Sequence, residues 1–238
     1  FALIREKLNV VKTASHPSGE IVRLQRNFIY HAFQTGDPDF EKSWGLNNTG
    51  NNDDVEGPGI AGIDIAALKA WRIETGSPKV IVAIPDSGMD LYHEDLQRNL
   101  WKNGAEIPGN SLDDYYNGFI DDARGWNFVD ASGDVQDDNN HGTFIAGIIG
   151  AAGANGKGSR GISNSSLMIV RMLDKNGTGT TERAVRALEY AVKNGAGIIN
   201  ISWGGMMYDA VLYDTVKWVN EQGVLCVVAS GNDAKNND

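Results

Sequence analysis

The sequence predicts an α/β fold in which a mainly parallel sheet is covered by helices on both faces. From residue 79 onward, apolar runs of strand length alternate with segments of helix length. Strands that are apolar along their whole length are typical of parallel sheets buried on both faces. The expected strands are residues 80–84, 167–173, 197–203 and 224–229, and the expected helices are residues 141–152, 181–193 and 209–222.

The part of the chain before residue 79 has a different character. Residues 2–11 predict a short helix, and the alternation over residues 20–30 predicts a strand. The polar residues 35–39 read as a linker because they contain Gly and Pro. A further short helix is expected over residues 65–73, ended by Gly-Ser-Pro at residues 76–78.

The boundaries of the two amphipathic helices follow from local chemistry. Residues 181–193 place apolar side chains on one face, and Gly195 is a natural stop signal. Asp209 is a suitable N-cap for the next helix, and Gly223 ends it.

The composition excludes several classes of function. The chain has 238 residues, of which 41% are hydrophobic and 22% charged, and a net charge of −10. Such acidity argues against nucleic acid as a partner, because phosphate binding relies on clustered Lys and Arg. No apolar run approaches the ~18 residues of a membrane span. The only cysteine, Cys226, excludes an internal disulfide, and its apolar neighbours predict a small buried core residue.

Three polar residues follow expected strands and predict a shared site. Asp86, Ser202 and Asn232 each stand just after an apolar run. In parallel sheets, sites form at the carboxyl ends of the strands, so these residues are expected at one edge. Each motif alone is typical of an ordinary turn or helix cap. The combination and its order carry the specificity.

Four segments in this order resemble the motifs of subtilisin-like serine proteases, and the resemblance extends over about residues 37–238. The segments are residues 80–88 (VIVAIPDSG) for the aspartate motif, 140–147 (NHGTFIAG) for the histidine motif, 200–205 (NISWGG) for the substrate-binding strand and 229–232 (ASGN) for the oxyanion segment. The resemblance implies a subtilisin-like three-layer sandwich, incomplete at its C-terminus here. Two positions depart from the family: Phe144 replaces a common second histidine, and Pro85 replaces an aliphatic residue.

The resemblance also implies roles for individual residues. Asp86 would fix the tautomer of His141 and stabilise its imidazolium, while the other ring nitrogen would exchange the proton of a serine hydroxyl. Asn232 would donate a hydrogen bond to the oxyanion of the tetrahedral intermediate.

A polypeptide substrate is the implied partner. It would pair with the strand edge at Ser202, Trp203 and Gly204. Residues Ala229, Ser230 and Gly231 would wall the pocket for the residue before the cut.

The nucleophilic serine is missing from the sequence. In the family it lies in a Gly-Thr-Ser segment well downstream of the oxyanion asparagine, and residues 233–238 contain no serine. The expectation is therefore a truncated serine endopeptidase that is inactive as this fragment. The alternative is a non-catalytic module that binds peptides without cutting them.

Calcium is the cofactor that the resemblance implies. The acidic residues 113–122 (DDYYNGFIDD) resemble a loop that many larger members use for Ca²⁺, with Asp113, Asn117 and Asp121 as the expected ligands. A second site is expected at Asp95 and the loop around Asn155. A plain solvated loop is the alternative in both places.

The domain expectations also follow from the resemblance. Residues 1–34 would be the last part of an inhibitory propeptide that acts on its own protease domain. Residues 35–52 would be a linker and the mature N-terminal loop, and residues 53–238 the first portion of the peptidase domain. This zymogen organisation implies a secreted, extracellular enzyme.

Overall fold

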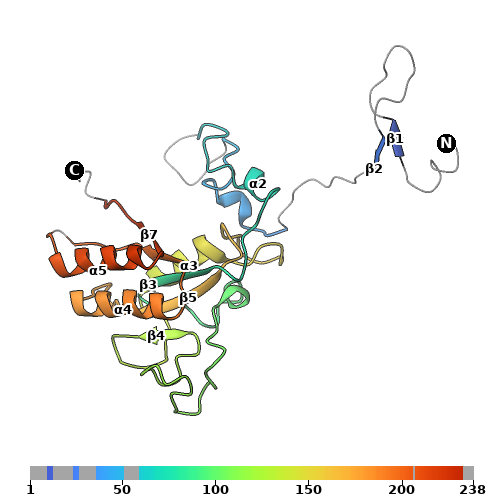
Figure 1. The fold of residues 1–238 in the computed structure, drawn as a ribbon. Helices are drawn as coiled ribbons and strands as arrows, with labels where there is room; N and C mark the ends of the chain where they lie inside the picture. The colour runs from blue at the N-terminus through green and yellow to red at the C-terminus, as the bar shows by residue number, and fades with distance from the viewer. Residues whose placement is uncertain (1–9, 13–23, 27–35, 51–58, 206, 233–238) are drawn as a thin grey trace. The chain divides into compact units, whose positions relative to one another are not determined.

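The computed structural model describes residues 10–12, 24–26, 36–50, 59–205 and 207–232 (Figure 1). The chain divides into two compact units, Phe1–Gln34 and Thr35–Asp238. In the first unit, strand β1 (Val10–Lys12) pairs antiparallel with strand β2 (Leu24–Arg26). The helix predicted over residues 2–11 is contradicted at residues 10 and 11, which belong to β1. Residues 2–9 lie outside the described part. The strand expected over residues 20–30 is described only at β2.

The second unit is built on a five-stranded sheet. Its strands are β4 (Gly125–Asn127), β5 (Ser166–Arg171), β3 (Ile81–Asp86), β6 (Ile198–Ile201) and β7 (Leu225–Val228). They lie in the order β4-β5-β3-β6-β7, and every neighbouring pair is parallel. Strand β3 therefore occupies the centre. Strand β4 was not expected from the sequence, because its three residues, Gly-Trp-Asn, are too few to show a periodicity.

Helices lie against both faces of this sheet, as predicted. The helices are α3 (His141–Gly150), α4 (Thr181–Lys193) and α5 (Ala210–Glu221). Figure 1 shows α4 and α5 side by side across the sheet, and their buried side chains join one core cluster. Helix α3 contributes to a different cluster. Neighbouring β3 residues alternate between the two, with Ala83 in the first cluster and Ile84 in the second.

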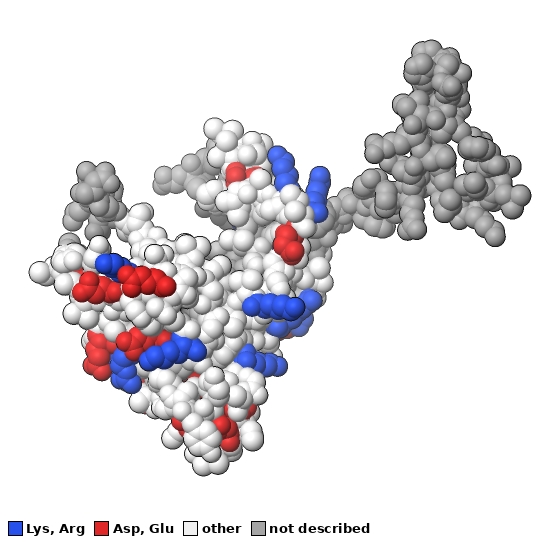
Figure 2. Space-filling view, viewed as in Figure 1, with Lys and Arg blue, Asp and Glu red and all other residues white. Residues whose placement is uncertain are grey.

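The ends of α4 and α5 follow the sequence closely. Thr180 caps α4 by accepting a hydrogen bond from Arg183 N, and Asp209 caps α5 by accepting one from Leu212 N. Acidic and basic side chains are interspersed over both helices on the face that Figure 2 draws. None of the helices in the described residues is long and apolar enough to cross a membrane.

Three short elements complete the described chain. They are the 3₁₀ helices η1 (Phe40–Lys42) and η2 (Gln97–Asn99) and the four-residue helix α2 (Ala67–Ala70). The helix expected over residues 65–73 is thus shorter, because Ala66 adopts a left-handed φ of 56°. Phe40 and Trp71 form a small separate core, and the Trp71 indole donates to Ile162 O at 2.8 Å.

Strand β7 departs from the expected burial. Leu225, Val227 and Val228 are 58, 49 and 57% exposed. Cys226 is half-buried rather than a buried core residue, and this partial burial raises the pKa of its thiol. The physical reason is position: β7 is the last strand in the sheet order, so β6 is its only partner among the strands that the structure describes.

Candidate active site

Asp86 and His141 meet at the carboxyl end of the central strand. Asp86 is the last residue of β3, and its side chain is 1% exposed. His141 is the first residue of α3, and its Nδ1 lies 2.8 Å from Asp86 Oδ1. The imidazole itself is 42% exposed. One side of the ring is therefore held by a buried carboxylate while the ring stays accessible from outside.

Close contact between two backbone segments produces this meeting. A Cβ atom on Gly142 would lie 2.1 Å from Gly88 O, so only glycine allows the approach. Gly142 N donates to the buried Ser87 Oγ at 2.9 Å. The residues next to Asp86 and His141 thus touch each other, which explains why the His-Gly-Thr motif needs its glycine. Gly88 of the Asp-Ser-Gly motif is needed for another reason: its φ is 117°, and a Cβ there would lie 2.7 Å from Val135 O.

The expected substrate-binding strand runs beside the central strand but separates from it at its end. β3 pairs with β6 only at Val82 and Ala83. Beyond that point the Trp203 indole donates to Pro85 O at 2.7 Å. Trp203 is half-buried and lies against the α4–α5 core, while Ser202 is half-buried and Gly204 exposed.

Proline at position 85 coincides with the end of the pairing between β3 and β6. The N and C=O groups of one strand residue face the same neighbouring strand. Since Pro85 O accepts from Trp203, Pro85 N also faces β6 and has no hydrogen to donate there. The missing donor accounts for pairing that ends at Ala83, and the Trp203 indole makes the next contact on that side.

The expected oxyanion segment lies at the open end of the sheet. Ala229 N donates to Ile201 O at 3.0 Å, which continues the pairing of β7 with β6. Ala229, Ser230, Gly231 and Asn232 are all exposed. Among the described residues, a hydrogen bond joins Asp86 to His141, whereas none joins Asn232 to either of them.

In the acidic loop, the side chains predicted to bind calcium accept hydrogen bonds from backbone N–H groups. Both carboxylate oxygens of Asp113 accept backbone N–H groups, from Asn117 and Gly118. The carboxylate of Asp121 accepts three more, from residues 109–111. Asn117 Oδ1 accepts from Phe119 N. Within the described part of the chain, no three His, Cys, Asp or Glu side chains form a metal-binding group.

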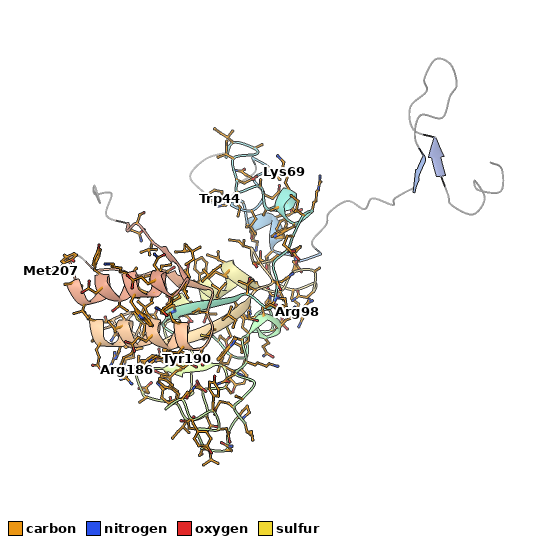
Figure 3. All side chains as sticks on the ribbon, viewed as in Figure 1. Trp44, Lys69, Arg98, Arg186, Tyr190 and Met207 are labelled. Carbon is orange, nitrogen blue, oxygen red and sulfur yellow. The ribbon has the colours of Figure 1, made fainter. Side chains whose placement is uncertain are left out.

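Two buried acids beside this loop were not singled out from the sequence. Asp122 is fully buried and accepts hydrogen bonds from Asn103 and from Tyr190, whose phenol is 2.7 Å away. Tyr190 belongs to α4, where Figure 3 labels it. Glu106 is 6% exposed, and its Oε2 has no hydrogen-bond partner. Burial raises the pKa of the Glu106 carboxyl, and the nearby charge of Asp122 adds to the shift.

The second predicted calcium site does gather its residues. Asn155 Nδ2 donates to the buried Asp95 Oδ1 at 2.6 Å. Asp37, also buried, joins them from the N-terminal segment, where its carboxylate accepts from Ala154 N and Asn155 N. The sequence pointed to Asp95 and Asn155 but missed Asp37, which stands over a hundred residues away from the loop.

Comparison with known proteins decides the family. The sequence profile of the subtilase family of peptidases matches residues 77–238. The chain belongs to the subtilase family. It is 36% identical to subtilisin-like protease 1 of Plasmodium berghei (strain Anka) over 176 residues, which cover 72% of this chain and 29% of that protein. It is 30% identical to a thermophilic serine proteinase of Bacillus sp. (strain AK1) over 231 residues, or 97% of this chain and 51% of that protein.

A third relative is named as an extracellular protease. The halolysin-like extracellular serine protease Nep of Natrialba magadii is 29% identical over 222 residues, covering 91% of this chain and 38% of Nep. The subtilase chain therefore spans between about a third and a half of the length of these relatives. Its first unit, residues 1–34, lies outside the matched family profile.

Proposed function

We propose that this subtilase chain supplies the aspartate and histidine of an Asp–His–Ser triad in a serine endopeptidase. The contact of 2.8 Å between Asp86 Oδ1 and His141 Nδ1 carries the proposal. A buried carboxylate at that distance favours the tautomer with the proton on Nδ1 and stabilises the imidazolium. The second ring nitrogen is then free to take the proton of a serine hydroxyl and return it to the leaving amine.

The serine would be encoded downstream of Asp238. It would attack the scissile carbonyl and form an acyl-enzyme while the amine product leaves with the proton from His141. In this proposal Asn232 donates to the oxyanion, and the strand after Ile201 pairs with the peptide through Ser202 and Gly204. The exposure of Gly204 and of residues 229–232, and the partial exposure of Ser202, support these roles, because each must be reachable by a peptide.

The full reading frame of the source gene tests the proposal. Hydrolysis of a peptide substrate by that protein should fall about 10⁴-fold in Asp86→Asn, which leaves the shape but favours the wrong tautomer. Asn232→Ala should cost about 10²–10³ in kcat through loss of one oxyanion donor. If the frame carries no downstream serine and the protein binds peptides without cutting them, the non-catalytic peptide-binding module replaces the endopeptidase.

We further propose that residues 1–34 inhibit this enzyme before cleavage and that the enzyme acts outside the cell. Basic residues outnumber acidic ones in residues 1–34, whereas acidic residues predominate in the rest of the chain. Opposite net charges favour association of the two units. A synthetic peptide of residues 1–34 should inhibit the cleaved enzyme, and added salt should weaken the inhibition. Equal activity with and without the peptide would contradict this role.

Calcium binding is proposed at the two acidic sites. Asp95 and Asn155 fit a hard cation once the Asn155 amide turns its oxygen toward Asp95, whereas both carboxylate oxygens of Asp37 already accept backbone N–H groups. At the other site, the buried free oxygen of Glu106 is better placed as a ligand than the occupied oxygens of Asp113 and Asp121. The ion would neutralise buried carboxylates and so stabilise the fold.

Thermal melting tests the calcium proposal. At about 100 times the dissociation constant, Ca²⁺ should add about 2.7 kcal/mol of stability per site. Asp95→Asn should remove one part of this gain and Glu106→Gln the other, while Asp121→Asn should remove neither. An unchanged melting temperature in millimolar Ca²⁺ would argue against both sites.

A further inference from the structure

The start of α3 is held by an unusual cap. Asn140 occupies the N-cap position with a left-handed φ of 83°, and its side chain caps nothing. Since the first N–H groups of a helix need acceptors, another group must take this role. Asp137 does so from outside the helix: its Oδ2 accepts from Thr143 N at 3.0 Å and from Thr143 Oγ1 at 2.6 Å.

The same carboxylate also fixes the loop that leads into His141. Asp137 Oδ1 accepts from Asn139 N at 2.9 Å and from Asn140 N at 3.1 Å. Four hydrogen bonds thus converge on one side chain. Although burial alone would raise the pKa of Asp137, the bonds from Thr143 and the loop amides outweigh it and lower the pKa.

Thr143 connects this cap to the segment that follows Asp86. Its hydroxyl donates to Asp137 and accepts from Asp90 N at 2.9 Å. Met89, next to Asp90, exchanges backbone hydrogen bonds with the segment that ends at Asp137: Met89 N donates to Val135 O, and Asp137 N donates to Met89 O. The aspartate-bearing and histidine-bearing segments are therefore joined by a closed set of contacts in addition to the Asp86–His141 bond.

We propose that Asp137 and Thr143 are positioning residues for His141: they orient the imidazole toward Asp86 by fixing the first turn of α3. The inference rests on the proposed function for its relevance to catalysis, but what it predicts directly is the orientation of the His141 imidazole. Neither residue touches the imidazole. Each acts through the backbone that carries it, and the 2.8 Å contact depends on that backbone.

The tautomer of His141 is the measurable consequence. When this chain is labelled with ¹⁵N at histidine, the NMR chemical shifts of the imidazole nitrogens report which nitrogen carries the proton. The spectra are recorded at about pH 8, above the ordinary histidine pKa of ~6.5. Four histidines are present, so His141→Ala assigns the signals. We expect the native chain to hold His141 in the Nδ1–H form.

Matched variants separate positioning from simple helix stability. Asp137→Asn and Thr143→Val should shift His141 to a mixture of tautomers, whereas Thr143→Ser keeps the hydroxyl and should keep the single form. Asp209→Ala is the control, because it removes the cap of α5 and should lower the melting temperature with no change at His141.

The proposal is overturned if Asp137→Asn and Thr143→Val both retain the native tautomer. Should Asp137→Asn fail to fold, Thr143→Val decides alone, since it removes only the hydroxyl contacts and keeps the backbone bond to Asp137. The ring nitrogen shifts need no serine. A failure of peptide hydrolysis in the full-length protein is thus distinguishable from a failure of this inference.

Discussion

The two halves of the candidate site differ in how completely they are built. The half around β3 and α3 is closed: Asp86 is 1% exposed, its partner is bonded to it, and glycine contacts lock the segments together. The half around β6 and β7 is open: residues 229–232 are exposed, and so are most side chains of β7. The contact between the proposed catalytic aspartate and histidine is thus preformed within this chain, while the proposed peptide-binding edge is exposed.

The difference indicates which half contributes more to the stability of the second unit. Central strands carry side chains buried on both faces, and each contributes its full hydrophobic transfer energy. The edge strand has an equally apolar sequence but contributes less, because water still reaches it. The contact between Asp86 and His141 lies in the half with more buried surface, whereas the proposed peptide-binding edge lies in the half with less.

The largest expected effect compares one strand from each half. Ile84→Ala empties a fully buried position in β3 and should lower the free energy of unfolding by about 2–5 kcal/mol. Val227→Ala on β7, where the side chain is 49% exposed, should change it by less than about 1 kcal/mol. Urea denaturation of both variants gives the comparison. Equal losses would show that β7 is buried in solution.

A smaller effect is expected within α3 itself. Gly142→Ala forces a Cβ against Gly88 O and should destabilise the protein by about 1–3 kcal/mol while displacing His141. Gly147→Ala, in the same helix, meets no atom within 4 Å and should stabilise it by about 0.5–1 kcal/mol. Both values come from the same denaturation experiment. A neutral Gly142→Ala would mean that the two motif segments lie further apart.

The smallest effect concerns pH and the buried Glu106. Its folded-state pKa is raised, so the folded protein holds the proton more tightly than the unfolded chain does. Stability from this group is present below the ordinary glutamate pKa and is lost as pH rises through the raised value. Glu106→Gln should therefore flatten this part of the melting-temperature profile, measured without Ca²⁺. A profile identical to that of the native chain would indicate an ordinary carboxyl pKa.

The sequence predicted the parallel sheet well because β3, β5 and the amphipathic helix α4 carry strong, uninterrupted patterns. It placed α4 and its stop correctly and identified the cap of α5 from Asp209. It missed β4, which is three residues long and is recognisable only by its pairing with β5. It also overestimated the burial of β7, since apolar content alone does not reveal which strand stands at the edge.

The candidate site was predictable to the extent that its residues stand inside motifs. The contact between Asp86 and His141 follows from two such motifs meeting at one strand end. The contributions of Glu106, Asp122 and Asp37 depend on tertiary contacts between distant segments, and no local spacing announces them. The cap formed by Asp137 belongs to the same class, because its acceptor lies outside the helix that it caps.

The bond between Trp203 and Pro85 constrains how this sheet can change over evolutionary time. Pro85 is buried, so its carbonyl oxygen would be left without a hydrogen-bond donor if Trp203 were replaced by a side chain that cannot donate, and this would cost stability. An aliphatic residue at position 85 would keep that carbonyl and so would keep the bond to the indole. The two positions are therefore unequal: the contact requires a side-chain donor at position 203 but no particular side chain at position 85.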